Sequence, residues 1–276
     1  MDKLRAFFLA PARAVNLLLF IVPMMIVLGY SLLSRGVYGG VERPFTLESY
    51  GRLIDPLYIG ILLRSFWISA LSTFICLVLG FPMALFIARS GARRNLYLNL
   101  VILPFWTSFL VRTYAWMFLL RDTGLINTVL QSLGITHQPL PLLYNDGAVI
   151  LGLVYGYLPF MVLPLYTSLE KLDMSLLEAS ADLGATPLVT LTRVIIPLSA
   201  PGIRAGSILV FITCLGAYLT PDLLGGSKTV MIGNVIQNQF TQARDWPFGA
   251  AVSLGLMALV MVMLIVVLKR DKEQLL

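Results

Sequence analysis

Six long apolar runs, separated by shorter polar segments, dominate the chain. Each run is close to the roughly 20 residues that a helix needs to cross a bilayer core of about 30 Å. Arg112 interrupts the third run, and the fifth run is the shortest. The pattern predicts an all-α, polytopic membrane protein, a single domain over residues 1–276, with six transmembrane helices at about 14–33, 65–88, 96–120, 147–169, 205–221 and 246–268.

The composition excludes a water-soluble body. The chain has 276 residues, of which 58% are hydrophobic and only 12% charged, and its mean hydropathy is +0.86. Soluble domains average about 25% charged residues, so most of this surface must face lipid. The first run is too long for a signal-peptide core and lacks a small-residue cleavage pattern, so we expect it to be retained.

Lysines and arginines are distributed unevenly between the predicted loops. The N-terminus, the 89–96 loop, the 170–204 loop and the C-terminal tail hold twelve, and the opposite loops hold seven. Cytoplasmic loops carry the excess of positive charge, so both termini are predicted to be cytoplasmic. The net charge of +6 is spread over these short clusters, which argues against a nucleic-acid partner.

Residues that build catalytic or metal sites are scarce. Cys76 and Cys214 lie inside apolar runs, and His137 is the single histidine. We therefore predict no metal site, no catalytic residue and no cofactor in this chain. Residues 225–229, Gly-Gly-Ser-Lys-Thr, differ from a nucleotide-binding P-loop because a serine separates glycine from lysine.

The segment 170–204 is long for a connection between spans, and its residues are patterned. Ser175 begins a Ser-x-x-Glu capping box, a typical helix start. Leu176, Ser180 and Leu183 then recur on one helical face. A short helix is therefore expected in the first half of this segment.

A glycine turn and a second short helix are expected next. Gly184 can adopt a positive φ without a Cβ clash, Thr186 followed by Pro187 marks a new helix start, and Pro197 is expected to stop that helix. We call segment 170–204 the helical hairpin. By pattern alone it is either an amphipathic element lying on lipid headgroups or a docking element for a partner protein.

The hairpin carries a resemblance to a known family. Residues 178–184, Glu-Ala-Ser-Ala-Asp-Leu-Gly, followed after nine residues by Val-Ile-Ile-Pro at 194–197, are similar to the EAA motif of binding-protein-dependent ABC importer permeases. Ser180, Val194 and Ile196 are small departures from its alanine, isoleucine and leucine. In that family the motif is a coupling helix seated on an ATPase, and the resemblance implies this role for Glu178, Ala179, Ser180, Asp182, Leu183, Gly184 and Pro197.

The resemblance also implies partners and a location. These are an ABC ATPase dimer that hydrolyses the ATP, a second homologous permease, an extracytoplasmic solute-binding protein and the lipid bilayer of a bacterial inner membrane. The chain itself would be a channel-forming subunit working by alternating access, not an enzyme. No predicted span has a carboxylate near its centre, which disfavours an ion-coupled carrier.

Further segments narrow the family. Residues 104–116, 158–165, 223–226 and 244–247 resemble the spermidine/putrescine importer permeases, the first permease of that system more than the second. The resemblance runs from about Thr46 onward and implies a polyamine substrate. Two alternatives stay open: a permease for another small cationic or amino-acid-like solute, and a membrane scaffold that transports nothing.

A polyamine path should offer carboxylates and aromatic faces to ammonium groups. We hypothesise that Asp222 pairs with Arg112 or meets a cation; alternatively, Arg112 snorkels outward and the aromatic rings serve interfacial belts or packing. Gly152 and Gly156 predict close helix packing. The candidate path residues are Arg112, Tyr114, Trp116, Tyr218 and Asp222.

Overall fold

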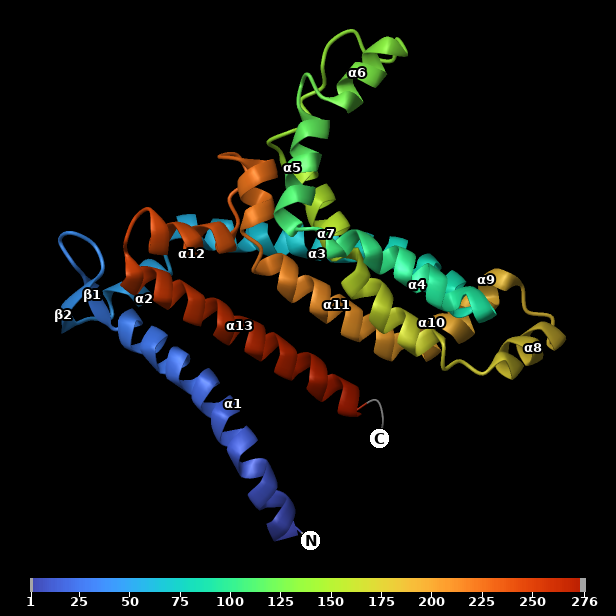
Figure 1. The fold of residues 1–276 in the computed structure, drawn as a ribbon, viewed down its shortest axis with the longest axis horizontal. Helices are drawn as coiled ribbons and strands as arrows, with labels where there is room; N and C mark the ends of the chain where they lie inside the picture. Colours follow the sequence, from blue (N-terminus) through green and yellow to red (C-terminus); the bar gives the residue numbers. More distant parts are fainter. Residues whose placement is uncertain (1, 274–276) are drawn as a thin grey trace. The chain divides into compact units, whose positions relative to one another are not determined.

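The computed structural model describes residues 2–273 and is almost entirely helical (Figure 1). The chain divides into two compact units. The first combines residues up to 60 with those from 235 onward, and the second spans 61–234. The long helix α3, Pro56–Ala88, and the short helix α12, Ile232–Thr241, each continue from one unit into the other.

In the first unit, the long helices α1 (Asp2–Ser31) and α13 (Trp246–Glu273) pack side by side (Figure 1). Asp245, which is buried and directly precedes α13, accepts a 2.8 Å hydrogen bond from the Arg52 guanidinium. The elements are α1 (Asp2–Ser31), the antiparallel strands β1 (Leu33–Arg35) and β2 (Val41–Phe45), α2 (Glu48–Arg52) and α13 (Trp246–Glu273).

The second unit is built around the packing of α7 against α11. Besides the body of α3, its elements are η1 (Gly91–Arg93), α4 (Arg94–Ile102), η2 (Leu103–Trp106), α5 (Phe109–Leu120), α6 (Leu125–Ser132), α7 (Asp146–Leu169), α8 (Met174–Asp182), α9 (Pro187–Thr190), the π-helical η3 (Leu191–Ile195), α10 (Ile196–Leu198), α11 (Ala200–Leu215) and the π-helical η4 (Pro221–Gly225).

Four helices of the described residues are long and apolar enough to cross a membrane, and two bent helix pairs bring the candidates to six. This agrees with the six predicted spans. Two helices begin earlier than predicted, α1 at Asp2 and α3 at Pro56. The prediction for α7 differs from the observed start by one residue, because Asn145 caps that start by accepting a hydrogen bond from the Ala148 amide.

The third predicted span, 96–120, is not one straight helix. The chain bends by 84° between its two halves, with Thr107 and Ser108 in extended conformations at the break. Pro104 explains the bend, since it lacks an amide hydrogen and crowds the preceding turn. The Pro104 carbonyl accepts hydrogen bonds from the Thr107 hydroxyl at 2.7 Å and from Arg112 Nη1 at 2.8 Å. The side chain of Arg112 therefore stabilises a broken span.

The fifth predicted span, 205–221, is also wrong at its end. The helix α11 ends at Leu215, and a turn follows before η4 begins. The Asn234 amide reaches into this turn and donates a 2.8 Å hydrogen bond to the Tyr218 carbonyl. The apolar run thus covers a helix, a turn and the start of another helical segment, which hydropathy does not distinguish.

Close glycine contacts hold α7 against its neighbours. A Cβ at Gly152 would lie 2.4 Å from Leu224, so the predicted close packing at this glycine is confirmed. On α11, a Cβ at Gly202 would lie 2.5 Å from Ser168 Cβ. These contacts leave no space for a side chain, so α7, α11 and η4 form one tightly packed group.

Ion pairs hold both ends of α7. At its start, Asp146 accepts hydrogen bonds of 2.5 Å from Arg64 of α3 and of 2.5 Å from the Thr229 hydroxyl. Just after its end, Glu170 pairs with Arg94, the first residue of α4. Consequently α7 is fixed to different helices at its two ends.

Candidate functional site

The first arm of the helical hairpin is α8, and its start differs from the prediction. The N-cap is Asp173, whose carboxylate accepts a 3.0 Å hydrogen bond from the Ser175 amide. This hydrogen bond holds the pKa of Asp173 below its usual value. The predicted cap at Ser175 is therefore wrong by two residues. Asp173, in the loop before the helix, accepts the hydrogen bond from the Ser175 amide, so the helix begins before Ser175 could cap it.

The turn between the two arms requires glycine. Gly184 has a φ of +76°, and a Cβ there would meet nothing within 4 Å, so the demand is conformational rather than spatial. Next to the turn, the hydroxyls of Ser180 and Thr190 lie 2.7 Å apart and join α8 to α9. Ser180 is 8% exposed. The serine at this position, where the motif has alanine, thus supplies the hydroxyl that joins the two arms of the hairpin.

The second arm begins as predicted. The Thr186 hydroxyl accepts a hydrogen bond from the Val189 amide, and Pro187 occupies the first turn of α9. Pro197 does not stop this arm: α10 runs through it to Leu198, and the chain bends by 68° only before α11. The preceding π-helical segment η3 explains this, since its wider turn accommodates a proline that lacks an amide hydrogen.

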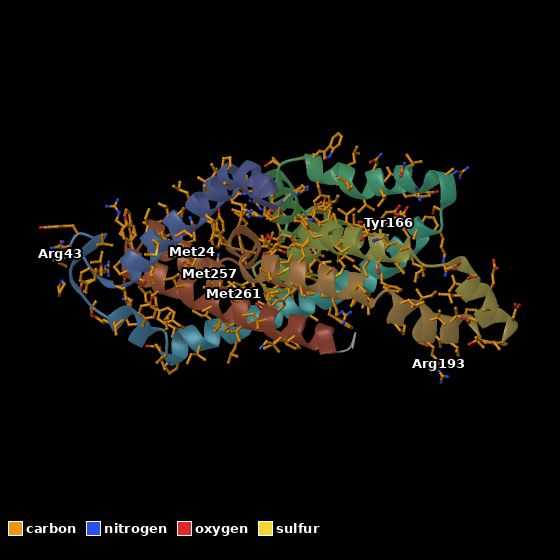
Figure 2. All side chains as sticks on the ribbon, turned by 90° about the horizontal axis from the view of Figure 1, so that it is seen from below. Met24, Arg43, Tyr166, Arg193, Met257 and Met261 are labelled. Carbon is orange, nitrogen blue, oxygen red and sulfur yellow. The ribbon has the colours of Figure 1, made fainter. Side chains whose placement is uncertain are left out.

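The outer surface of the hairpin combines leucines with acidic groups. Leu183 is 88% exposed and Leu188 is 69% exposed, one on each side of the glycine turn. Glu178, Ala179 and Asp182 are exposed on α8, and Gly184 in the turn and Pro197 in α10 are exposed as well. Figure 1 shows α8 and α9 projecting beyond the ends of the long helices of the same unit, and Arg193 points outward from the second arm in Figure 2. Two exposed leucines beside acidic groups, at the tip of a hairpin that projects from the spans, make this surface a candidate binding site.

A second candidate site is a cavity of about 540 Å³ between α5, α7 and the end of α11. Phe109 and Tyr157 line it with stacked rings whose centroids are 6.4 Å apart. Tyr218 lines it from the turn after α11 and is 44% exposed. Thr213 and Thr220 add hydroxyls to the wall. The arrangement offers aromatic faces and oxygen atoms to a small ligand.

The structure brings together only part of the predicted path. Tyr218 lines the cavity, and Asp222 lies one turn further on, its amide donating to the Tyr218 carbonyl. Arg112 lies behind the wall, with its guanidinium 5.9 Å from the Phe109 ring centroid and 4.4 Å from that of Phe105. The hypothesised Arg112–Asp222 pair is not among the ion pairs of residues 2–273.

Two further aromatic candidates lie elsewhere. Trp116 packs edge-on against Tyr155 with ring centroids 5.5 Å apart, and Tyr114 is an exposed residue of α5. Sequence reasoning missed Phe109 as a cavity residue. Its position directly after the extended residues at the break would have indicated it, had the break at Pro104 been recognised.

Six candidate spans and an exposed helical hairpin between two of them are the features of a polytopic α-helical membrane protein. The chain belongs to the family of binding-protein-dependent transport system inner membrane components, whose model matches residues 77–270.

Several curated proteins are similar over most of their length. The chain is 47% identical over 252 residues to the spermidine/putrescine transport system permease protein PotB of Escherichia coli K12, covering 91% of this chain and 92% of that protein. It is 43% identical to PotB of Haemophilus influenzae, with 91% and 88% covered. It is 37% identical to the inner membrane ABC transporter permease protein YdcU of E. coli, with 78% and 72% covered.

Solved structures share the fold. A chain of a bacterial ABC transporter that imports alginate has a TM-score of 0.72 at 18% identity, with 99% of this chain and 97% of that chain covered. A chain of the MetNI methionine ABC transporter has a TM-score of 0.51 at 18% identity, with 80% and 97% covered. The all-α architecture predicted from the sequence is thus an ABC importer permease fold.

Proposed function

We propose that this chain is the channel-forming permease subunit of an ATP-driven importer that moves polyamines such as spermidine and putrescine into the cell. The similarity to the PotB proteins over nine-tenths of the chain supports the substrate class. The chain contains no ATP-hydrolysing motif, so a separate ATPase dimer supplies the energy. The subunit works beside a second homologous permease and receives its substrate from an extracytoplasmic solute-binding protein.

The observation that carries this proposal is the exposed helical hairpin. Leu183 and Leu188 bind an apolar groove of the ATPase, and Glu178 and Asp182 meet polar groups at the edge of that groove. The Ser180–Thr190 hydrogen bond keeps the two arms together when the hairpin is moved. A surface of this composition is better suited to a protein groove than to anionic headgroups, because its charged groups on α8 are acidic.

Movement of the hairpin is transmitted to the membrane through α7 and α11. The hairpin connects these two helices, and the close contact at Gly202 prevents them from sliding independently. ATP-driven closure of the ATPase dimer therefore tilts both helices together. The tilt opens the permease alternately to the two sides of the membrane.

The aromatic cavity is part of the substrate path in this proposal. An ammonium group is attracted to the ring faces of Phe109, Tyr157 and Tyr218, and Asp222 attracts it electrostatically from one turn away. Arg112 acts indirectly by fixing the break in the third span and the ring of Phe109. Trp116 and Tyr114 lie on α5 outside the lining of this cavity.

Orientation follows from the same proposal. The hairpin meets an ATPase in the cytoplasm, so both termini are cytoplasmic and α6 lies outside. In cells that lack the ATPase, a cysteine placed at Leu183 should react with a membrane-impermeant maleimide only after the cells are permeabilised. Labelling of this cysteine in intact cells would refute the orientation.

The function is tested in proteoliposomes that contain the complete complex and no membrane potential. We expect ATP-dependent uptake of radiolabelled spermidine, inhibited by excess putrescine and unaffected by amino acids. Inhibition by an amino acid instead would identify the alternative substrate class.

Replacing Leu183 with glutamate should abolish co-purification of the ATPase, whereas the same change at Leu133, equally apolar and 67% exposed outside the hairpin, should not. A chain that neither binds an ATPase nor supports uptake would be a scaffold.

A further inference from the structure

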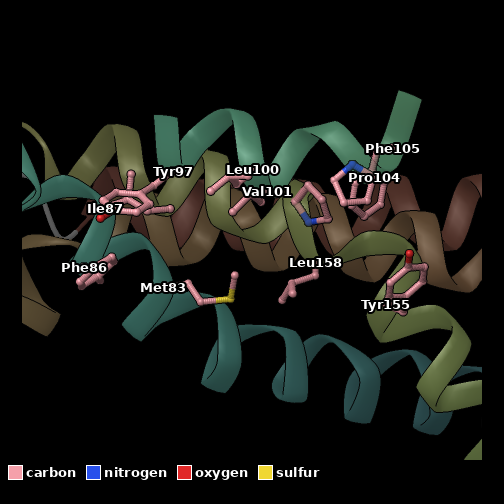
Figure 3. Close-up of a pocket in the computed structure, with 11 residues that line it drawn as sticks. Met83, Phe86, Ile87, Tyr97, Leu100, Val101, Pro104, Phe105, Tyr155 and Leu158 are labelled. Atoms are coloured by element: carbon pink, nitrogen blue, oxygen red, sulfur yellow. The ribbon is translucent and has the colours of Figure 1, made fainter. Parts of the chain in front are cut away.

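An apolar groove of about 390 Å³ runs between α3, α4 and α7 of the second unit (Figure 3). Tyr97 and Tyr155 are the lining residues with a polar side chain, and the other side chains of the lining are apolar. Leu100 in its wall is 56% exposed, so the groove opens away from the packed centre of the unit. The principal lining residues are Met83, Phe86, Tyr97, Leu100, Phe105 and Tyr155.

Two arginines that form no ion pair within the described residues lie one helical turn from groove residues. Arg89 follows Phe86 by one helical turn, and Arg93 precedes Tyr97 by one turn, while the rings of Phe86 and Tyr97 are 5.2 Å apart. Both arginines are exposed, and within the described chain neither forms a side-chain hydrogen bond or ion pair. Their neighbour Arg94 differs, because it pairs with Glu170.

We propose that the groove and the two arginines form a binding site for one anionic phospholipid. An acyl chain fills the groove, and the headgroup phosphate binds Arg89 and Arg93. From Tyr97 to Pro104 the wall rises by seven helical steps, roughly 10 Å, which is enough for the upper part of an acyl chain.

The two halves of the site select the ligand together. A neutral lipid fills the groove but leaves both guanidinium charges unneutralised. A free phosphate neutralises them but leaves the apolar wall exposed to water. An anionic lipid fills the groove and neutralises the two guanidinium charges. It can reach the site by diffusion within its leaflet, because the 89–96 loop lies at the level of the headgroups. The inference goes beyond substrate transport and requires only that the 89–96 loop lies at the membrane surface.

Native mass spectrometry of the purified full-length chain tests the site. Phosphatidylglycerol and phosphatidylcholine with identical acyl chains are offered in equal amounts, and the retained lipid is counted. We expect one retained phosphatidylglycerol. Replacing Arg89 and Arg93 together with glutamine should weaken the preference for phosphatidylglycerol by roughly 30-fold, since each cationic contact near a membrane surface contributes about a factor of five. Glutamines at the exposed Arg43 and Lys228 remove the same charge elsewhere and should leave it unchanged.

A second pair of variants tests the groove. Leu100→Trp fills it and should reduce retention, whereas Leu96→Trp, on the same helix, 57% exposed and outside the lining, should not. Inorganic phosphate at millimolar concentration should not displace the lipid. Equal retention of both lipids, equal effects of the two tryptophans, or displacement by phosphate would overturn the proposal. So would a cross-link from position 100 to the second permease in the assembled complex. Unchanged thermal unfolding of each variant shows that the loss is not misfolding.

Discussion

Gly184 is the residue at which the coupling role of the hairpin can be tested most sharply. Its φ of +76° lies in the left-handed region, where a residue with a Cβ costs about 1–2 kcal/mol. A Cβ there would meet nothing within 4 Å, so alanine adds strain without a clash. If the hairpin must keep this turn to bind the ATPase, Gly184→Ala should weaken binding by a factor of roughly 5 to 30.

Binding of the ATPase to the permease in lipid nanodiscs measures this effect directly. Asparagine tolerates the left-handed region better than alanine, so Gly184→Asn should fall between glycine and alanine. The matched control is Gly40→Ala, since Gly40 has a φ of +80° with equally open surroundings but lies in the β1–β2 hairpin of the first unit. Alanine that binds as well as glycine at 184, or an equal loss at 40, would refute the reasoning.

Three further predictions concern the bent third span, the contact between α7 and α11, and the aromatic cavity. Arg112→Gln removes the hydrogen bond to the Pro104 carbonyl and should destabilise the permease by about 1–3 kcal/mol, seen as a lower unfolding temperature; an unchanged temperature contradicts the assigned role. Gly202→Val forces its side chain against the Pro164 carbonyl and Ser168, so ATP hydrolysis should continue with reduced spermidine uptake; full coupling would show that the close contact at Gly202 is not needed for transmission. Tyr218→Leu should raise the KM for spermidine by about 2- to 5-fold while Tyr218→Phe should not, and identical values for the two would exclude a cation–π contact.

The sequence predicted the number of spans and most of the hairpin well, because both depend on local signals. Apolar length sets each span, while Thr186, Pro187 and Gly184 are strong and independent markers of a helix start and a turn. The cap at Asp173 was missed since the serine two residues later has an equally good local pattern.

The bends were not predictable from hydropathy. A run of apolar residues has the same mean hydropathy whether it is straight or broken, and a single proline inside a span, such as Pro159 in α7, often leaves the helix continuous. At Pro104 the break depends on residues further along the chain. The Thr107 hydroxyl and the Arg112 guanidinium donate hydrogen bonds to the Pro104 carbonyl, in place of the backbone amide that would do so in a continuous helix.

The aromatic cavity was predicted least well for a related reason. Its residues come from α5, α7 and the turn after α11, and only tertiary packing brings them together. Tyr218 was identified from its residue type, whereas Phe109 was overlooked because an apolar ring inside a span has no distinguishing local signal.

The two ion pairs at the ends of α7 have a consequence for the surrounding bilayer. The helix has 24 residues and is therefore about 36 Å long, against a hydrocarbon core of about 30 Å. Since Arg64 and Arg94 connect its two ends to different helices, a shift of α7 along its axis to follow a thinner or thicker membrane would break these ion pairs. Hydrophobic mismatch is then relieved by tilt, which is also the motion that the proposed mechanism requires. Acyl-chain length should consequently tune the turnover rate, with an optimum thickness set by these two pairs.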